Sequence, residues 1–178
     1  MRPLNQSREQ PPNLLPVAGR AKGTPATAAL TAAGVAYEMH PYRHDPSADS
    51  YGDEAASALG VDPARLFKTL IAAVDGRMVC ALVPAAGRLD LKALASAVRG
   101  KRAVMAEPAA AQRATGYVTG GISPLGQKSR LPVVVDTSAA EFDTVFVSAG
   151  RRGLQVSLAL ADLIQLTGAM TAPITARR

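Results

Sequence analysis

From residue 24 onward, the apolar and polar positions of the chain alternate between helical and strand-like periods, with capping or turn residues at each change. Thr24 and Pro25 are typical of the start of a helix and Gly34 of its end. The alternation of residues 35–40 then predicts a strand. A second helix is expected at residues 52–59, because acidic residues stand in its first turn and a glycine follows its last residue.

The middle of the chain carries the clearest turn signal. Residues 68–84 read KTLIAAVDGRMVCALVP, in which an Asp-Gly pair separates two apolar runs and so predicts a β-hairpin. A helix with an aspartate cap is expected at residues 91–98 and a short strand at residues 103–105. A proline then starts a short helix that ends before Gly116.

The last third of the chain has short strand-like segments separated by turns. Strands are expected at residues 116–121, 131–136, 143–148 and 153–158, followed by a helix at residues 159–166. Several links are too short for a βαβ crossover, so the sheet is predicted to be mixed rather than doubly wound and parallel. The predicted fold class is α+β, with a mixed, barrel-like β-sheet surrounded by helices.

The expected domain organisation is a short extension followed by one domain. Residues 1–22 contain four prolines and no sustained period, which predicts a flexible N-terminal extension. The remaining residues, 23–175, are predicted to form a single domain. With 178 residues and 48% apolar side chains, the chain is long enough for one hydrophobic core.

The formal net charge of +6 is concentrated at the two ends of the chain. Residues 1–23 carry a balance of +3 and the two C-terminal arginines add +2, which leaves +1 for the body. Eight basic residues of the later body have few acids between them: Arg99, Lys101, Arg102, Arg113, Lys128, Arg130, Arg151 and Arg152. If they share a face, a polyanion could dock there; the alternative is a set of separate solvated charges.

The cysteine count and the hydropathy narrow the class of protein. Cys80 is the single cysteine, which excludes an intrachain disulfide and a cysteine-based zinc site, and its apolar neighbours predict a buried thiol. No apolar run is long enough to span a membrane, and the N-terminus has no signal-like apolar segment. A cytoplasmic protein without a membrane partner is therefore expected.

Two histidines lie close together in the sequence. His40 and His44 are four residues apart, as metal-binding histidines on a helix would be, and Asp45 could be a third ligand. Pro41 falls between them and disfavours a regular helix. The favoured interpretation is a polar loop with two solvated imidazoles and no metal site.

Lys68 stands in an otherwise apolar strand. Strand alternation places it on the side of Leu66 and Leu70, while Phe67 and Ile71 point the other way, so both faces are predicted to be covered. A lysine in this position must extend its ammonium to solvent, lower its pKa or meet an anion. Two interpretations remain: a lysine that reaches out at the strand end, and a lysine that lines a pocket for a phosphate or carboxyl group.

The segment GGISPLGQKSR, at residues 120–130, has two interpretations of its own. It differs from a phosphate-binding P-loop because Gln127 occupies the position of the required lysine. Gly120 and Gly121 permit positive φ and the close approach of a ligand, and Pro124 fixes one φ angle. The segment is either a rigid turn that presents N–H groups to a carbonyl or a tight connection between strands.

Several segments occur in a characteristic order: HPYRHDP, YGDEAASALG, FKTL, LDLKALA, QRATGYVTGGISPLGQKSRLP and VSAGRRGL. Together they resemble the YbaK/EbsC group of aminoacyl-tRNA deacylases, which is related to the editing domain of bacterial prolyl-tRNA synthetases. The resemblance extends from about Thr24 to Ile174. Its most specific part, TGYVTGGISPLGQK, points to the YbaK branch, which clears cysteine from mischarged tRNA for proline.

The resemblance implies a set of site residues. It places the functional residues at Lys68 and at Gly120, which begins a Gly-x-x-x-Pro motif. The implied substrate-binding residues are Tyr42, Tyr51, Thr69, Gly121, Ile122, Ser123, Pro124 and Ser148. Gln155 stands where some relatives carry an acidic side chain, so a role of that carboxylate does not transfer to this chain.

The resemblance also implies a reaction. A single-domain, trans-acting editor would release cysteine from Cys-tRNA(Pro), with the substrate's own thiol attacking the ester carbonyl, and without a cofactor or metal. The tRNA would be chosen through competition with an elongation factor or through a complex with prolyl-tRNA synthetase. Two different functions remain open: a non-catalytic module that binds the tRNA 3′ end or a synthetase, and a deacylase for another amino acid such as alanine.

Overall fold

The structure is a computed structural model that describes residues 22–176. The expected extension, residues 1–22, lies outside this range except for Lys22, so the predicted domain organisation stays a prediction. Within the described range, no helix has the length and hydropathy needed to cross a bilayer.

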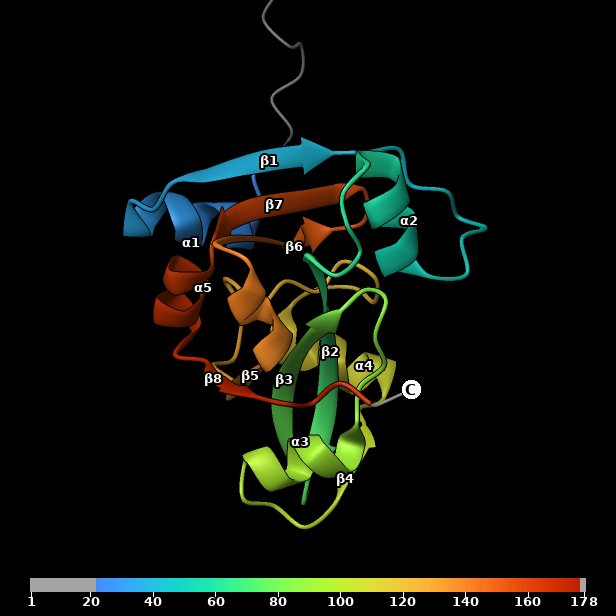
Figure 1. The fold of residues 1–178 in the computed structure, drawn as a ribbon, viewed down its shortest axis with the longest axis vertical. Helices are drawn as coiled ribbons and strands as arrows, with labels where there is room; N and C mark the ends of the chain where they lie inside the picture. Colours follow the sequence, from blue (N-terminus) through green and yellow to red (C-terminus); the bar gives the residue numbers. More distant parts are fainter. Residues whose placement is uncertain (1–21, 177–178) are drawn as a thin grey trace, which may run out of the picture.

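Residues 22–176 contain five α-helices, one 3₁₀ helix and eight strands (Figure 1). In chain order they are α1 (Pro25–Ala33), β1 (Tyr37–Pro41), α2 (Tyr51–Leu59), β2 (Leu66–Val74), β3 (Arg77–Pro84), α3 (Leu91–Ala97), β4 (Ala103–Met105), α4 (Pro108–Thr115), β5 (Val133–Asp136), the 3₁₀ helix η1 (Thr137–Glu141), β6 (Thr144–Arg151), β7 (Leu154–Ala159), α5 (Leu160–Thr167) and β8 (Met170–Ala172).

The strands form one mixed sheet. Its order is β1-β7-β6-β2-β3-β5-β8, with β4 paired to β2 outside this path. The pairs β2·β6, β3·β5 and β5·β8 are parallel, and the remaining pairs are antiparallel. Strands β1, β6 and β7 lie at one end of the molecule with α1 and α2, and β2 and β3 extend toward α3 at the other end (Figure 1). The predicted α+β class with a mixed sheet and surrounding helices is confirmed.

Strand β2 has a gap along one of its edges. Its opposite edge pairs with β3 from Phe67 to Val74. On the gapped edge, β6 pairs only with Leu66 and Phe67, and β4 pairs only with residues 72–74. Within the described part of the chain, residues 68–71 therefore have no strand partner on that side, and this stretch is called the gap in β2.

The core lies on both faces of β2, as its apolar pattern predicts. Phe67 and Ile71 belong to the largest cluster of buried side chains, which also receives α1, β6 and β7. Ala72 and Val74 point to the opposite face, where they pack with Leu94 of α3 in a second cluster. Burial on both faces fixes the register of β2, because a shift of one residue would exchange the two sets of side chains.

The strand predicted at residues 116–121 is wrong. This segment forms turns, and both Gly116 and Gly120 have positive φ angles, +79° and +84°, which an extended strand does not have. Tyr117 is only 3% exposed, and its hydroxyl donates to the carbonyl of Leu125 at 2.7 Å. The apparent alternation reflects one buried tyrosine that closes a loop on itself.

The local pattern also fails to predict β8. This strand is followed by Ile174 and Thr175, whose N–H groups donate to a carboxylate oxygen of Asp136 at 2.9 and 2.8 Å. Asp136 is buried and lies 38 residues earlier in the chain than Ile174. A contact over such a distance leaves no periodic signal in a short segment.

Candidate functional site

A cavity of about 390 Å³ opens at the gap in β2. It is lined by the start of α2, by β2, by the end of β4 and the first part of α4, by residues 119–124 between α4 and β5, here called the Gly120 loop, and by β6 and β7. The lining positions are residues 49–52, 66–71, 105, 106, 108, 111, 119, 120, 122, 148 and 155. This volume lies within the usual range for a small-molecule site.

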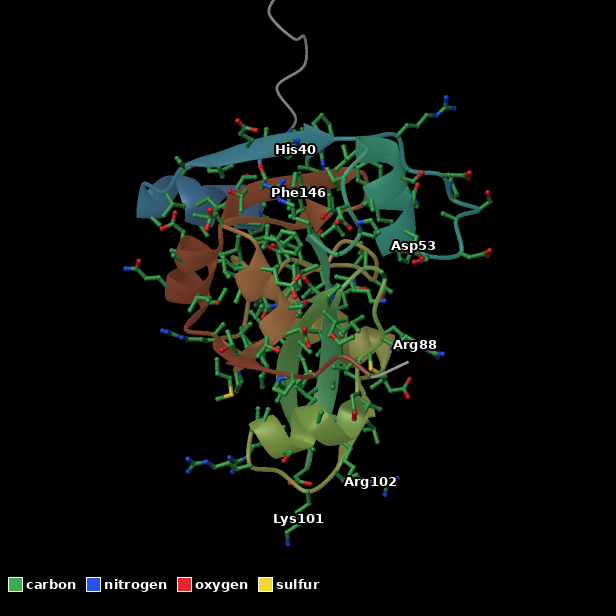
Figure 2. All side chains as sticks on the ribbon, viewed as in Figure 1. His40, Asp53, Arg88, Lys101, Arg102 and Phe146 are labelled. Atoms are coloured by element: carbon green, nitrogen blue, oxygen red, sulfur yellow. The ribbon has the colours of Figure 1, made fainter. Side chains whose placement is uncertain are left out.

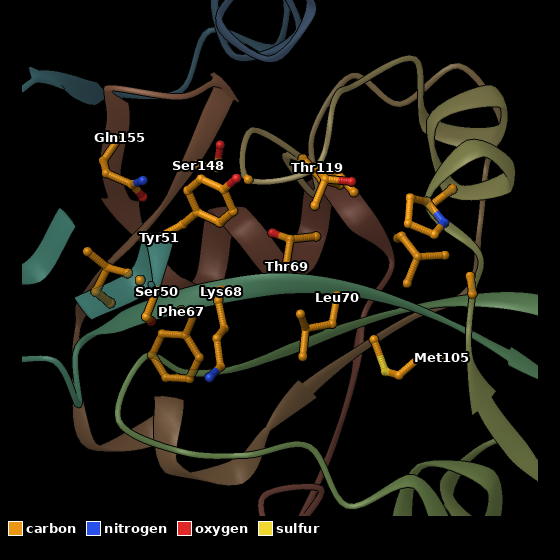
Figure 3. A pocket seen from close by; sticks show the side chains of 18 of the residues that line it. Ser50, Tyr51, Phe67, Lys68, Thr69, Leu70, Met105, Thr119, Ser148 and Gln155 are labelled. Carbon is orange, nitrogen blue, oxygen red and sulfur yellow. The ribbon is translucent and has the colours of Figure 1, made fainter. Parts of the chain in front are cut away.

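The two ends of the cavity differ in character (Figure 3). Gln155, Ser148 and Tyr51 gather at one end, whereas Leu70 and Met105 lie at the other. Gln155 is 6% exposed, and its amide oxygen Oε1 has no hydrogen-bond partner within residues 22–176. A buried amide oxygen without a partner carries a desolvation cost that a bound ligand can remove.

Lys68 lines the cavity with a half-buried side chain. Its Nζ donates to the carbonyl of Ala85 at 3.3 Å. Burial lowers the pKa of Lys68; the carboxylate of Asp53 opposes this effect and the charge of Arg88 adds to it. The ammonium of Lys68 therefore contacts a backbone carbonyl, and the interpretation of Lys68 as a lysine that binds a phosphate or carboxyl group stays a prediction.

Tyr51 and Gly120 pack directly against each other. A Cβ atom at Gly120 would lie 2.7 Å from two carbon atoms of the Tyr51 ring, closer than van der Waals contact allows. On the same ring, Arg152 stacks with its Cζ 5.2 Å from the ring centroid, while its Nε donates to the carbonyl of Thr119 at 2.9 Å. Ring and guanidinium thus hold the Gly120 loop at the mouth of the cavity.

The Gly120 loop presents free backbone donors. Gly121 N–H donates to the carbonyl of Val118 at 2.9 Å, which closes a tight turn. In the described residues, no acceptor lies in hydrogen-bonding geometry with the N–H groups of Gly120, Ile122 or Ser123. Gly120 and Ile122 line the cavity, and Ile122 is only 9% exposed, so its amide is a donor that water does not fully solvate.

The structure brings together six of the ten site residues that the sequence predicts. Lys68, Gly120, Tyr51, Thr69, Ile122 and Ser148 line the cavity. Thr69 adds a buried hydroxyl oxygen that has no partner in the described part of the chain. Ser148 faces Gln155 across the β6–β7 pair.

Four predicted residues are not part of the lining. Gly121 and Ser123 are buried residues of the loop that do not line the cavity, and Pro124 borders a second cavity of about 270 Å³. The N–H of Tyr42 donates to the carbonyl of Gly153 at 2.9 Å. The partly buried Tyr42 side chain packs against the cluster that contains Ala55, Leu66 and Phe146, and burial raises its pKa.

The interpretation of His40 and His44 as solvated side chains of one loop is wrong. His40 belongs to β1, and its Nε2 lies 2.8 Å from the hydroxyl of Ser157. His44 is 20% exposed, and its Nδ1 lies 3.0 Å from a carboxylate oxygen of Glu54. The two imidazoles therefore have different partners: His40, on β1, contacts Ser157, and His44, in the following loop, contacts Glu54. No group of three or more metal-ligating side chains occurs in the described residues.

The His44–Glu54 pair supports the cavity from behind. Because the carboxylate can only accept, Nδ1 of His44 must donate. Glu54 also accepts the N–H of Asp45, and its side chain is 10% exposed. The His44 ring lies 5.8 Å from the ring of Tyr51. Glu54 therefore fixes the imidazole that borders Tyr51, a role that no local sequence signal marks.

The later basic residues lie on separate parts of the surface. Arg152 covers Tyr51 at the cavity. Lys101 and Arg102 lie at the far end of the molecule, at the bottom of Figure 2. Arg130 borders the second cavity. Whole-chain basicity therefore does not define one docking face.

The sequence matches the family model described as the aminoacyl-tRNA editing domain over residues 45–166. The chain belongs to this family. The matched range contains every residue that lines the cavity. The family assignment confirms the resemblance and the enzyme class expected from the sequence, an aminoacyl-tRNA deacylase.

Two curated relatives carry names for related deacylases. One, from Enterococcus faecalis, is named as the Cys-tRNA(Pro)/Cys-tRNA(Cys) deacylase EbsC; it is 36% identical over 126 residues, which are 70% of this chain and 77% of the relative. The second, from Escherichia coli K12, is named multifunctional Ser/Thr-tRNA deacylase ProXp-y. It is 35% identical over 104 residues, which are 56% of this chain and 62% of the relative.

Solved structures share the fold. One described as a trans-editing enzyme for prolyl tRNA synthetase superposes with a TM-score of 0.74 at 24% identity, covering 86% of this chain and 96% of its own. A second gives a TM-score of 0.76 at 22% identity and is covered over its whole length. Because both structures are less than 25% identical to this chain, the similarity shows a shared fold only.

Replacing Gly120 by Ala tests the contact with Tyr51. We expect the free energy of unfolding to fall by about 2–4 kcal/mol, because the substitution adds a clash to a positive φ angle. Gly76→Ala is the matched control: Gly76 has a φ of +81° and nothing within 4 Å of the added Cβ. Urea unfolding should give only about 1 kcal/mol for the control. Equal losses for the two variants would contradict the contact.

Replacing Glu54 by Ala tests the support behind Tyr51. Because the His44 imidazole and the Asp45 amide would lose their common acceptor, unfolding should become easier by about 1–3 kcal/mol, and kcat/KM for deacylation should fall. Glu38→Ala removes a carboxylate whose side chain is 82% exposed and is expected to change stability by less than about 0.5 kcal/mol. A Glu54 variant as stable and active as the Glu38 variant would show that the pair supports nothing.

Proposed function

We propose that this chain is a trans-acting editing enzyme that releases cysteine from Cys-tRNA(Pro), with the charged tRNA end bound over the gap in β2. The observation that carries the proposal is a cavity that can hold an ester but has no nucleophile of its own. The family and the name of the Enterococcus relative support it. The expected place of action is the cytoplasm, where aminoacyl-tRNA would be met as a substrate.

No side chain at the cavity is equipped to attack an ester. Of the lining residues within 22–176, none is a cysteine or a histidine. Cys80 is fully buried, and burial raises the pKa of its thiol to about 12. Ser50, Thr69, Thr119 and Ser148 offer hydroxyls, but a serine or threonine nucleophile requires an adjacent base. In the described residues, none of these hydroxyls is hydrogen-bonded to a histidine, a lysine or a carboxylate. The attacking group must come from the substrate or from water.

Cysteine can supply that group itself. Its thiol sulfur forms a bond to the ester carbonyl carbon, the bond from that carbon to the ribose oxygen breaks, and the thiol proton ends on the released ribose hydroxyl. The products are a cyclic thiolactone, which water opens, and free tRNA. Intramolecular placement can correspond to effective molarities of about 10⁵–10⁸ M, so positioning alone is a sufficient contribution from the protein.

The side chains divide the positioning between them. The N–H groups of Gly120 and Ile122, which both line the cavity, are the proposed donors to the ester carbonyl, at the place where negative charge develops. Lys68 is the proposed anchor of the tRNA end, once its Nζ exchanges the Ala85 carbonyl for a phosphate oxygen. Tyr51 and Ser148 form the wall beside the amino acid. Tyr42 and residues 121, 123 and 124 act from behind by shaping this wall.

A second candidate function is the removal of serine or threonine. It is favoured by the name of the Escherichia coli relative and by the unpartnered oxygens of Thr69 and Gln155 in the described chain, which can accept a hydrogen bond from a substrate hydroxyl. Water would then attack the ester. An alanine editor would differ from both candidates in amino-acid preference, and a non-catalytic module would bind charged tRNA without turnover. Association with prolyl-tRNA synthetase is proposed as the source of tRNA choice.

A panel of tRNA(Pro) charged with cysteine, serine or alanine separates these functions. We expect the kcat/KM of deacylation for cysteine to exceed that for serine by at least about 100-fold, because only the thiol is a strong internal nucleophile. Release of the labelled amino acid measures the rates. Serine hydrolysed as fast as cysteine would favour the second candidate, and binding without turnover would contradict catalysis.

Replacing Lys68 by Ala tests the anchor. Loss of a charged contact to the tRNA end should lower kcat/KM at least about 100-fold, with the fold retained by circular dichroism. Lys92→Ala is the matched control, since Lys92 is exposed on α3 and does not line the cavity. Full activity in the Lys68 variant would remove this residue from the mechanism.

A further inference from the structure

The gap in β2 turns backbone polar groups toward the cavity. In an antiparallel pair, the N–H and C=O groups of one residue point to the same side, and successive residues alternate. Ala85 N–H donates to the carbonyl of Leu66 at 2.7 Å on the β3 side, and Ala106 N–H donates to the carbonyl of Ile71 at 3.0 Å on the opposite side. Odd-numbered residues of β2 therefore face β6, the gap and β4.

Thr69 is the odd-numbered residue in the middle of the gap. Neither β6 nor β4 reaches it, so its N–H and C=O groups face the cavity without a strand partner in the described chain. The N–H of Ile71 points the same way. Although Ile71 accepts from Ala106, no return bond from Ile71 N–H to the Ala106 carbonyl is formed. An acceptor, the Thr69 carbonyl, thus stands beside a donor, the Ile71 amide, on one open strand edge.

This pair of groups matches one edge of a nucleobase. Adenine presents an amino donor at N6 beside an acceptor at N1 on its Watson–Crick edge, and unstacked bases are commonly read on that edge. Guanine and uracil present the two groups in the opposite order. Cytosine has the same order as adenine, but the substrate under the proposed function is a tRNA, and a tRNA ends in adenosine.

The walls beside this edge suit the faces of a purine ring. Leu70, Met105, Pro108 and Ile122 are apolar lining residues of the cavity, and Figure 3 shows Leu70 and Met105 at the end away from Gln155. Apolar side chains, with a polarizable methionine among them, are good stacking surfaces for a base. The polar end remains available for the amino acid.

We propose that the Thr69 carbonyl and the Ile71 N–H read the Watson–Crick edge of the tRNA's terminal adenosine, and that the apolar end of the cavity is an adenine subsite. This inference rests on the proposed deacylase function, since it names the part of the same substrate that the gap receives. In this subsite, adenine N1 accepts a hydrogen bond from the Ile71 N–H, and the N6 amino group donates one to the Thr69 carbonyl.

Deacylation of charged RNA with altered 3′-terminal nucleosides tests the subsite. Purine riboside lacks the N6 donor and 1-deazaadenosine lacks the N1 acceptor. Each should lower kcat/KM about 5- to 20-fold, as expected when one hydrogen bond is lost and its partner stays unpaired. 7-Deazaadenosine, which is altered on a different edge of the base, is the matched control and should stay within about 2-fold of adenosine.

The possible outcomes are distinguishable. Equal kcat/KM for all four termini, with the adenosine substrate hydrolysed normally, would overturn the adenine subsite and leave the deacylase function intact. No hydrolysis of the adenosine substrate would overturn the deacylase function and the subsite together.

A competition experiment separates the tRNA end from free adenine nucleotides, which share the same base. AMP should inhibit at least about 100-fold more weakly than a non-hydrolysable 3′-amide of cysteine and adenosine, because it lacks the contacts of the polar end. Inhibition by AMP as strong as that by the amide would overturn the assignment to the tRNA terminus.

Discussion

The site depends on an incomplete strand pairing. Strand β2 is fixed along one whole edge by β3 and at both ends of its opposite edge, by β6 and by β4. Burial on both faces keeps β2 in register, so the unpaired stretch between its end contacts is held rigidly open. Backbone groups in such a gap are too costly to bury without partners. The fold thus provides a cavity whose wall must be satisfied by water or by a ligand.

Around this gap, the protein supplies positioned contacts and no reactive group. Tyr51 lies so close to Gly120 that a Cβ atom cannot fit, and the N–H groups of Gly120 and Ile122 have no acceptor within residues 22–176. Lys68 is the single cationic side chain among the described lining residues. In the proposed reaction, the aminoacyl ester is already activated, and orientation of its carbonyl against the substrate's own thiol would supply the barrier reduction that many hydrolases obtain from a catalytic triad.

Much of the fold can be predicted from the sequence, because its helices carry explicit caps. The side chains of Thr24 and Asp90 accept N–H groups at the starts of α1 and α3, and an Asp-Gly turn joins β2 to β3. The strand predicted at residues 116–121 is wrong, because the one buried tyrosine in this segment produces the same alternation of buried and exposed positions as a strand. The open edge of β2 could not be predicted either, since it depends on where β4 and β6 stop, and pairing between distant segments has no local signature.

The candidate site, too, has residues that could be predicted from the sequence and residues that could not. Lys68, Gly120 and Tyr51 could be placed from sequence through family resemblance, and they line the cavity. Glu54 and His44 could not, because their contact depends on how α2 packs beside the preceding loop. Met105 and Pro108 are ordinary apolar residues whose position at the cavity only the folded chain reveals.

The most direct test of the central claim is a crystal structure of the protein with the non-hydrolysable 3′-amide of cysteine and adenosine. The account predicts that the adenine lies against Thr69 and Ile71, that the carbonyl oxygen accepts from the Gly120 loop, and that the thiol sulfur is nearer to the carbonyl carbon than any protein nucleophile is. An analogue bound away from the gap in β2, or a protein side chain in attacking position, would contradict it.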